Sequence, residues 1–370
     1  MVASERRIRV LHVSETLGSG VATALQAYIS ATPQFDHIVL ASPHRGYSIG
    51  KSRGAAGSVA FIEMRARRLQ QFIDTARALR CTQPDLVHAH SSWAGALARP
   101  LARLMSYPIV YSPHCYAFLR EDVSRAARAL FWLVERVLAR ITSGYAVAGP
   151  FEARLSRRLS RRALIAEVVP ALAKNPILTE TVAKTHDICT VGRICPQKGP
   201  EFFIEVIDLL HEAGWHGSAT WIGAGDEREE GLLRERGICV TGWQNRDDVL
   251  ATMSGSRIYI HTATWEAGFP YAVLEAAALG LPIVARAIGP LRDRTGPELF
   301  SSTSSMAERL LELLDSEDES AKLARSCTQS AGPAWKELQG VALSTLYRQL
   351  VPVQSVQGRR ASKIFPTKGL

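Results

Sequence analysis

Residues 265–282 read WEAGFPYAVLEAAALGLP, and this stretch guides the interpretation of the whole chain. It follows a short apolar run at 257–261, so the expected order is strand, polar loop with Glu266, Gly-Phe-Pro turn, and helix with Glu275. Free backbone N–H groups at such a helix start suit an anion such as phosphate. A carboxylate further along the helix can accept two hydrogen bonds from a ribose diol. The stretch predicts a nucleotide-sugar site. The alternative is an ordinary strand-to-helix connection with surface glutamates.

Length and composition favour two packed domains. The chain has 370 residues, 46% of them hydrophobic, which is more than one ordinary domain holds. It contains no apolar run long enough to span a membrane, and its first residues lead straight into a strand pattern instead of a signal-peptide core. We therefore expect a cytoplasmic protein.

Charge is distributed unevenly along the chain. Residues 1–185 hold 25 Lys and Arg against 12 Asp and Glu, a net charge of +13, whereas residues 186–370 hold 19 against 23, a net charge of −4. A basic half can face a membrane surface, a lipid-linked phosphate or a nucleic acid. A solvated arginine-rich surface is the alternative. The six cysteines form no CxxC pair, so we expect reduced core residues instead of a disulfide or zinc framework.

The first half alternates short apolar runs with helical patterns, which predicts a parallel sheet with helices on both faces. Ligands in such sheets bind beyond the carboxyl ends of the strands. The loop after the first strand contains Gly18 and Gly20, where a ligand could approach the backbone closely. The third glycine of a dinucleotide GxGxxG motif is missing, which disfavours a nicotinamide cofactor.

Histidines occur at two positions of interest in this half. His114 follows the strand expected at 108–112, where it could bind a sugar hydroxyl or carry a proton near neutral pH. A structural or solvent-facing histidine is the alternative. His88 and His90 occupy alternate strand positions, but no carboxylate or cysteine nearby completes a metal site, so we expect no metal there.

Two helical patterns close the first half. Residues 120–140 predict a long amphipathic helix. Its expected buried side carries Leu130, Phe131, Leu133, Val134 and Val137. Residues 151–164 carry arginines at spacings that put several on one helical face. These are Arg154, Arg157, Arg158, Arg161 and Arg162. A basic face of this kind can hold a cytoplasmic enzyme to anionic lipid.

A second series of strands and helices begins after residue 187. A strand at 188–191 leads into a glycine loop that contains Arg193 and Lys198, and Pro200 suits the first position of the helix that follows. Two cations beside a glycine loop suit a diphosphate. The change of composition between residues 170 and 187 indicates the domain boundary.

Four motifs of the second half, in this order and spacing, resemble the retaining glycosyltransferases of family 4, the bacterial polysaccharide type. They are Val191-Gly-Arg193-x4-Lys198-Gly199, Gly223-Ala-Gly225-Asp226, Val240-Thr-Gly242-Trp243 and 266–282, with which 11–20 and Pro113-His114 agree. The resemblance covers nearly the whole chain. It implies an α/β chain with the GT-B fold, in which two Rossmann-like domains face each other across a cleft.

The same resemblance implies the domain limits. The acceptor-binding domain would span 1–178 and the nucleotide-sugar donor domain 179–334. A helix at 335–350 would cross back to the first domain, and 351–370 would form a basic flexible tail.

Residue roles follow from the resemblance at matching positions. Arg193 and Lys198 would hold the donor diphosphate and stabilise the leaving group, and Glu275 would bind the ribose hydroxyls. His114 would contact the donor sugar near the reacting carbon. The remaining donor-binding positions would be Gly18, Gly20, Gly242, Trp243, Gly268, Phe269 and Pro270.

Glu266 departs from the family pattern. Eight residues separate it from Glu275, one more than in the family's usual glutamate pair, although we retain Glu266 among the expected catalytic residues. The implied reaction is metal-independent hexosyl transfer with retention, without a cofactor beyond the donor. The departing diphosphate oxygen would help to deprotonate the acceptor, and the two domains would close over the donor.

The acceptor is expected to be a lipid-linked or growing glycan of a cell-surface polysaccharide, reached from the inner membrane face. The basic first half would then meet an anionic membrane surface as a peripheral protein, and no nucleic acid is expected as a partner. Two alternatives remain. A nucleotide-sugar epimerase of the same fold would convert the donor without an acceptor, and a non-catalytic anionic-surface binding module would release no diphosphate and bind less at high salt.

Overall fold

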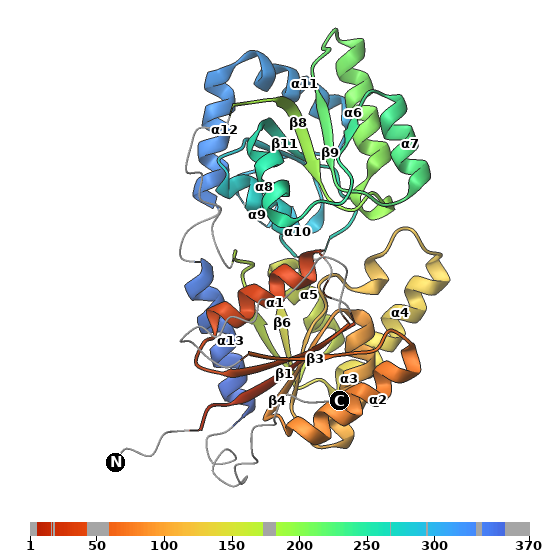
Figure 1. The fold of residues 1–370 in the computed structure, drawn as a ribbon, viewed down its shortest axis with the longest axis vertical. Coiled ribbons are helices and arrows are strands. Elements are labelled where there is room, and N and C mark those ends of the chain that lie inside the picture. The colour runs from red at the N-terminus through yellow and green to blue at the C-terminus, as the bar shows by residue number, and fades with distance from the viewer. Residues whose placement is uncertain are drawn as a thin grey trace.

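The computed structural model describes residues 6–15, 17, 19–42, 59–172, 183–266, 268–293, 295–330 and 335–351. It contains two parallel β-sheets, one in each half of the chain, and the two halves lie one above the other along the longest axis of the molecule (Figure 1). The predicted α/β class with two Rossmann-like units is confirmed.

The first sheet has seven parallel strands in the order β3-β2-β1-β4-β5-β6-β7. The strands are β1 (Arg9–Ser14), β2 (Asp36–Ala41), β3 (Val59–Glu63), β4 (Leu86–His90), β5 (Ile109–Ser112), β6 (Gly144–Val147) and β7 (Leu164–Glu167). The strand order reverses between β1 and β4. In such sheets the ligand crevice opens beyond the carboxyl ends of the strands at this point. The start of α1 with Gly20 follows β1, and the loop with His114 follows β5, the strand next to β4.

Helices cover both faces of the first sheet. They are α1 (Ser19–Ala31), α2 (Arg68–Thr82), α3 (Ser92–Leu104), α4 (Arg125–Leu138) and α5 (Pro150–Leu159), with short 3-10 turns η1 (Ala117–Leu119) and η2 (Ala139–Ile141). Val10 and Leu86 share one core with α1 and the C-terminal helix, whereas Leu11 and Val87 share another with α2, α3 and α5. This alternation follows from the two-residue period of a strand.

The second sheet has six parallel strands in the order β10-β9-β8-β11-β12-β13. The strands are β8 (His186–Val191), β9 (Ala219–Ile222), β10 (Cys239–Val240), β11 (Ser256–His261), β12 (Ile283–Arg286) and β13 (Glu298–Phe300). The helices are η3 (Pro196–Lys198), α6 (Pro200–Glu212), α7 (Glu227–Glu235), α8 (Arg246–Ser254), α9 (Tyr271–Ala278), α10 (Gly289–Arg292), α11 (Thr303–Asp315) and α12 (Glu317–Ser330). One large apolar cluster forms the core of this half.

Helix α13 (Trp335–Leu350) returns to the first half and lies beside α1, as predicted (Figure 1). Gln339 Nε2 donates to the Val169 carbonyl at 2.9 Å, and the Tyr347 hydroxyl lies 2.7 Å from His88 Nδ1. The predicted domain division at residue 178 lies outside the described residues, and so does the tail after residue 351. Both stay predictions.

The predictions for helices α4 and α5 of the first half were wrong in detail. Helix α4 spans only Arg125–Leu138, and Leu130, Leu133, Val134 and Val137 are exposed instead of buried. Its one buried residue is Glu135. Periodicity identified the amphipathic helix, but the buried ion pair that fixes its orientation involves a residue of another helix, which periodicity cannot show.

Helix α5 ends at Leu159, so Arg161 and Arg162 lie in the bend that follows it and not on a helical face. Two of the remaining arginines are paired with carboxylates, Arg154 with Asp293 at 3.0 Å and Arg157 with Glu167 at 3.2 Å. The expected basic face is therefore shorter and partly neutralised.

All six cysteines are free, as predicted, but only Cys189 and Cys327 are buried. Cys81 and Cys239 are exposed and the other two are half-buried, so the expectation that cysteines belong to the core holds for two of them. A thiol is small enough for surface positions as well as core positions, and local sequence does not separate the two.

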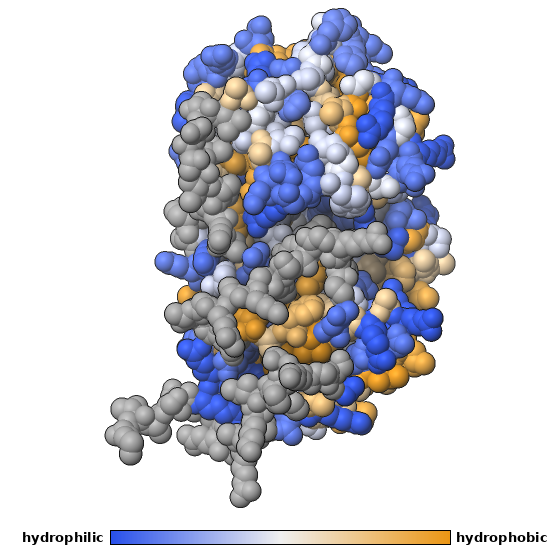
Figure 2. Space-filling model, viewed as in Figure 1, coloured by the Kyte–Doolittle hydropathy of each residue, from blue (hydrophilic) through white to orange (hydrophobic). Residues whose placement is uncertain are grey.

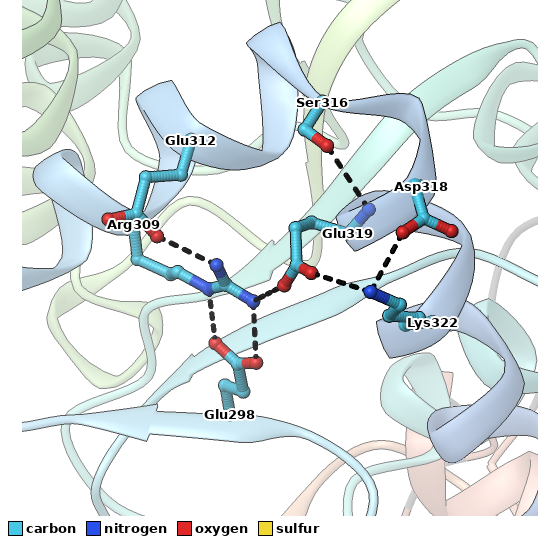
Figure 3. A network of polar contacts seen from close by, with 7 residues as sticks. All are labelled: Glu298, Arg309, Glu312, Ser316, Asp318, Glu319 and Lys322. Atoms are coloured by element: carbon cyan, nitrogen blue, oxygen red, sulfur yellow. Dashed lines mark hydrogen bonds and ion pairs between the residues drawn. The ribbon is translucent and has the colours of Figure 1, made fainter.

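The acidic run at 315–319 lies where α11 meets α12. Arg309 binds Glu298 at 2.8 Å, Glu312 at 2.7 Å and Glu319 at 3.2 Å, and Lys322 binds Asp318 and Glu319 (Figure 3). This ion-pair network joins both helices to β13.

None of the described helices has the length and hydrophobicity that crossing a bilayer requires.

Candidate functional site

The loop after β8 places two cations at the end of the second sheet. The Lys198 ammonium forms an ion pair with Glu266, which lies in the loop after β11. The two loops are tied together by Thr264, whose N–H donates to the Gln197 carbonyl at 2.9 Å, and by Gln197 Nε2, which donates to the Trp265 carbonyl at 3.1 Å. Glu266 therefore lies against Lys198 despite its altered spacing from Glu275.

Arg193 differs from Lys198 in its surroundings. Its side chain is exposed, and among the described residues it has no ion-pair or hydrogen-bond partner. An exposed, unpaired guanidinium beside an ammonium already paired with one carboxylate can bind a second anion without first breaking an ion pair.

Glycines of the next loop support the Arg193 loop. A Cβ added to Gly223 would collide with the Gly192 carbonyl oxygen, and one added to Gly225 would collide with the Ile194 carbonyl oxygen. Ile194 and Gly225 also form an isolated parallel bridge. The Gly223-Ala-Gly225 motif thus allows close contact between two backbone loops, which holds Arg193 in place.

Glu275 lies on α9 and is buried, as expected of a residue with a fixed position. It pairs with Arg246, the first residue of α8, at 3.0 Å. Burial raises the pKa of the Glu275 carboxyl, and Arg246 opposes that rise. Trp243 lies in the loop before α8 and is 68% exposed, so its ring is open to stacking.

Residues 268–270 form the turn before α9. A Cβ on Gly268 would collide with the Cβ of Ala148, which lies in the loop after β6, so this glycine lets the two halves meet. The Phe269 side chain is buried and packs edge-on against Trp335. Pro270 precedes the first turn of α9. Side chains of these residues serve packing, which leaves only backbone groups for a ligand.

The loop after β5 carries His114 in a constrained backbone conformation. His114 has a φ of 50° and Cys115 a φ of 100°, and residues other than glycine rarely have φ values in this positive range. The buried Glu152 carboxylate accepts from the Ala148 N–H at 2.8 Å and from the Cys115 N–H at 3.4 Å. Burial raises the pKa of Glu152 to about 7, against the effect of these two N–H groups.

The two sets of loops face each other. Burial raises the pKa of the Cys115 thiol, and among the charges that act on it are those of Glu266 and Lys198. Residues next to His114 in the first half therefore lie within electrostatic range of the Lys198–Glu266 pair in the second. Of the predicted site residues, the structure brings Lys198 and Glu266 into contact, and Cys115, which follows His114, lies within range of their charges.

A chain of four imidazoles runs inward from His114. His114 Nε2 lies 3.0 Å from His90 Nδ1, His90 Nε2 lies 3.0 Å from His12 Nδ1, and His12 Nε2 lies 3.0 Å from His37 Nδ1. The chain ends at the carbonyl of Thr32, 2.9 Å from His37 Nε2. Burial lowers the pKa of all four rings, that of His114 to about 4, so they are neutral at pH 7.

The carbonyl at the inner end assigns the tautomer of every ring in the chain. A carbonyl only accepts, so His37 must be protonated on Nε2, and each following ring must donate from Nε2 in turn. His114 then carries its proton on Nε2 and leaves Nδ1 as an acceptor. Among the described residues Nδ1 of His114 has no partner. It can therefore accept a hydrogen bond from a hydroxyl group.

Ring nitrogens of His12, His88 and His90 lie within 4.8 Å of one another, as three ligands of a metal would. Both nitrogens of each ring are already engaged, however. His88 contacts the Tyr347 hydroxyl at 2.7 Å and Ser112 Oγ at 2.9 Å, and the other two rings belong to the chain described above. A metal here would have to break several of these hydrogen bonds, so the donor set fits the polar network better than a metal.

Gly18 lies outside the described residues. Gly20 lies in the first turn of α1 and is exposed, and among the described residues no atom lies near the position of an added Cβ. The approach of a ligand to this helix start stays a prediction.

Four residues of the site were missed at the sequence level. His12 lies in β1, next to β4, and His37 lies in β2, next to β1; a histidine within a buried strand is a usable signal. Glu152 lies in α5, where the prediction considered only the arginines. Arg246 was not distinguished from other surface arginines, because its partner Glu275 is distant in the sequence.

Two family descriptions match the chain. Residues 6–171 match a glycosyl transferase 4-like domain, and residues 185–316 match glycosyl transferases group 1. A relative from Klebsiella pneumoniae, an uncharacterised 41.2 kDa protein in the cps region, is 22% identical over 84% of this chain and 90% of its own length. UDP-Gal:alpha-D-GlcNAc-diphosphoundecaprenol alpha-1,3-galactosyltransferase of Escherichia coli is 22% identical over 58% of this chain and 61% of its own length.

Solved structures share the fold at low sequence identity. Anabaena Alr3699/HepE in complex with UDP and glucose has a TM-score of 0.72 and 15% identity, covering 94% of this chain and 100% of the other. Sucrose-phosphate synthase from Thermosynechococcus elongatus has a TM-score of 0.75 and 15% identity, over 93% and 99% of the two chains. WaaG, a glycosyltransferase involved in lipopolysaccharide biosynthesis, has a TM-score of 0.69 and 14% identity, over 93% and 100%.

Proposed function

The chain belongs to the group 1 glycosyltransferases of the family 4 type, and we propose that it moves a hexosyl group from a nucleoside diphosphate sugar to a hydroxyl group with retention at the anomeric carbon. The observation that carries this proposal is the Lys198–Glu266 pair, which lies in the same loop region as Arg193 and within range of Cys115 in the His114 loop. Two cations are available for a diphosphate, and a neutral imidazole is available for the sugar beside it.

The proposed transfer breaks one bond at the anomeric carbon and forms another. The bond between the anomeric carbon and the diphosphate oxygen breaks, and a bond from the acceptor oxygen to the same carbon forms on the same face. The acceptor proton passes to the departing diphosphate oxygen, so no side chain needs to act as base. Arg193 and Lys198 stabilise the charge that develops on the diphosphate.

His114 and Glu266 have supporting roles in this proposal. His114 Nδ1 accepts a hydrogen bond from a hydroxyl of the donor sugar, and its low pKa keeps the ring neutral. Glu266 pairs with Lys198 in the free protein and gives up part of that contact when the diphosphate binds. The reaction needs no metal, because the two cations supply the charge that a divalent ion would otherwise provide.

Glu275 and Trp243 recognise the nucleoside part of the donor. Glu275 accepts hydrogen bonds from the ribose hydroxyls beside Arg246, which favours its ionised form, and Trp243 stacks beside the base together with Gly242. Backbone groups of 268–270 and of Gly20, and of Gly18 by sequence, approach the sugar and phosphates. We favour UDP as the nucleotide because the similar galactosyltransferase uses UDP-Gal and the similar Anabaena structure holds UDP.

The acceptor is assigned to the lipid-linked glycans of cell-surface polysaccharide synthesis at the inner membrane face. One relative is named for the cps region, and another acts on a diphosphoundecaprenol-linked sugar. The net charge of +13 on residues 1–185 suits an anionic membrane surface, to which the protein would bind peripherally from the cytoplasm.

A donor screen tests the proposal. Thermal unfolding is measured with UDP-, GDP-, ADP- and dTDP-sugars, and the stabilising donor is then incubated with lipid-linked acceptors in the presence and absence of EDTA. The expected result is stabilisation by one nucleotide class and diphosphate release that requires acceptor and survives EDTA. A changed nucleotide sugar without acceptor would indicate an epimerase, and stabilisation by none of the donors would contradict the proposal.

A further inference from the structure

One carboxylate holds two loops of the first half together. Glu152 lies on α5 and is buried, and its two oxygens accept from different loops. One oxygen accepts from the Ala148 N–H at 2.8 Å and the other from the Cys115 N–H at 3.4 Å. Ala148 lies in the loop after β6 and Cys115 in the loop after β5, and these two strands are neighbours. Glu152 therefore connects the loop that carries His114 to the next loop of the sheet.

The His114 loop is attached to α5 at a second point. The Tyr116 hydroxyl lies 2.7 Å from Ser156 Oγ, and both residues are completely buried. Residues 152 and 156 are four apart, so they lie on the same face of the helix. The two residues that follow His114 are thus both bound to one face of α5.

His114 and Cys115 need such support because of their backbone. Their φ values of 50° and 100° are positive, which costs free energy for residues other than glycine. A strained conformation of this kind persists only where the surrounding contacts hold it. The hydrogen bond to Glu152 is made by the strained backbone itself, so loss of the carboxylate would let the loop relax.

Helix α5 also contacts the second half. It packs against α10, and its Arg154 pairs with Asp293, the residue after α10, at 3.0 Å (Figure 1). Ala148 lies against the turn before α9, where a Cβ added to Gly268 would collide with its own Cβ. Glu152 is therefore placed between the His114 loop and the half that would hold the donor.

We propose that Glu152 is a positioning residue for the transfer, because its carboxylate holds the His114 loop in place relative to the turn before α9. The inference rests on the proposed function, in which Nδ1 of His114 accepts a hydroxyl of the donor sugar. Glu152 is buried, so it acts through the loop and not on the donor. A displacement of the loop by about 1 Å would misplace that nitrogen and slow the reaction.

The ionised form of Glu152 serves both loops best. A carboxylate accepts at both oxygens, whereas the protonated acid has one hydroxyl that donates and accepts only weakly. Burial raises the pKa of Glu152 to about 7, and the two N–H groups only partly oppose this rise. The buried charge costs folding free energy, but it supplies an acceptor that the neutral acid lacks. The attachment of the loop should therefore strengthen as the pH rises through about 7.

Other ionisable groups around Glu152 titrate outside this range. Burial raises the pKa of the phenol and thiol groups nearest to it, and it lowers the pKa of His114 to about 4. The groups with raised pKa values are Tyr28 of α1, Cys115 and Tyr116 of the loop, and Tyr145 of β6. The carboxylates on β7 and after α10, Glu167 and Asp293, are paired with arginines of α5. None of these phenol, thiol and imidazole groups changes charge between about pH 6 and 8.

A first test needs no donor, so its outcome is independent of the proposed transfer. The full chain is labelled with nitrogen-15 in cysteine, and the Cys115 amide signal is assigned by comparison with Cys115→Ser. We expect this signal to shift with a midpoint at about pH 7 in the unmodified protein and to stay constant in Glu152→Gln. A signal that does not shift in the unmodified protein, or that shifts equally in Glu152→Gln, would overturn the inference.

A second test measures kcat for transfer and the KM of the donor across the same pH range. At about pH 8, kcat of Glu152→Gln should be about tenfold below that of the unmodified protein, with the KM of the donor the same within about twofold. At about pH 6 the two kcat values should agree within about twofold, because glutamine resembles the protonated acid. The difference between the two proteins should therefore appear only as Glu152 ionises.

The matched control is Glu167→Gln on β7, which removes a carboxylate that pairs with Arg157 of α5. This variant should keep the kcat and the pH profile of the unmodified protein, and circular dichroism should show all variants folded. A ratio of kcat values between Glu152→Gln and the unmodified protein that does not vary with pH would overturn the positioning role. If the unmodified protein transfers no sugar, the proposed function fails, while the amide titration still decides whether Glu152 holds the loop.

Discussion

Helices α4 and α6 have the same amphipathic period but opposite sides buried. Helix α6 buries Phe203, Val206 and Leu210 and leaves its acidic residues at the surface. Helix α4 buries Glu135 and leaves Leu133 and its apolar neighbours in solvent. The same contrast applies to the two halves as a whole. The first half keeps a chain of histidines and the Arg99–Glu135 ion pair under its helices, whereas the second packs one large apolar cluster and places most of its ion pairs at the surface.

This difference indicates a division of labour. The second half can fold around its core and hold Arg193 and Lys198 ready for an anion. Figure 2 shows hydrophobic residues at the surface of the lower half, on the side where Figure 1 places α2 and α4. The first half leaves the apolar side of α4 exposed, which is typical of a surface that contacts another molecule.

The largest expected effect concerns the ion pair that orients α4. Glu135→Ala leaves the Arg99 guanidinium buried without its partner, and we expect it to lower the free energy of unfolding by about 3–5 kcal/mol. Glu167→Ala removes the exposed pair with Arg157 and should cost less than about 1 kcal/mol. Urea unfolding of both variants measures this. Similar small losses would mean that the Glu135 pair does not hold the helix.

A second pair of variants compares the apolar sides of the two helices. Leu210→Ala in α6 should lower the free energy of unfolding by about 2–5 kcal/mol, because it opens a cavity in a packed core. Leu133→Ala in α4 should change it by no more than about 0.5 kcal/mol in the absence of lipid. Chemical denaturation is again the measurement. If both changes cost the same, the exposed apolar side chains of α4 are covered in the free protein.

Buried Glu152 adds a pH dependence to the first half. Its pKa is raised by burial from 4.5 to about 7, so the folded state binds a proton that the unfolded state releases. Its contribution to stability is fully present below about pH 4.5 and is lost as pH rises to about 7, by about 3 kcal/mol in total. The difference between the unfolding curves of the unmodified protein and Glu152→Gln across this range should show that slope. A difference that does not vary with pH would contradict the raised pKa.

The smallest effect tests the histidine chain. His12→Phe removes the link between His90 and His37, so the Thr32 carbonyl no longer fixes the tautomer of His114. We expect kcat/KM for transfer to fall about tenfold, equivalent to about 1.4 kcal/mol. In nitrogen-15 NMR spectra, Nδ1 of His114 should change from unprotonated to a mixture of states. The control is His216→Phe at an exposed position, and equal loss of activity in both variants would argue against a positioning role.

Much of the fold could be predicted from the sequence because it depends on local patterns. Apolar strands, glycine loops and helix starts identified both sheets, and the return of α13 was anticipated by resemblance. The inward side of α4 could not be predicted, since Arg99 lies 36 residues from Glu135 and only the fold brings them together.

The site residues could also be predicted only where they belong to local motifs. Arg193, Lys198, Glu266 and Glu275 stand in recognisable motifs, and the structure places Lys198 against Glu266. The partnership of Glu275 with Arg246 was invisible, because hydrogen-bond and ion-pair partners distant in the chain leave no local pattern. The imidazole chain also depends on three neighbouring strands, because β2, β1 and β4 carry His37, His12 and His90.

The central claim is that Arg193 and Lys198 hold the diphosphate of a sugar donor. The most direct measurement is kcat for nucleoside diphosphate release in Arg193→Ala and Lys198→Ala, with Arg228→Ala on the exposed side of α7 as the control. We expect each site variant to lose about 10²–10³-fold in kcat while remaining folded, as for removal of a group that stabilises developing charge. An unchanged rate in Arg193→Ala and Lys198→Ala would contradict the claim.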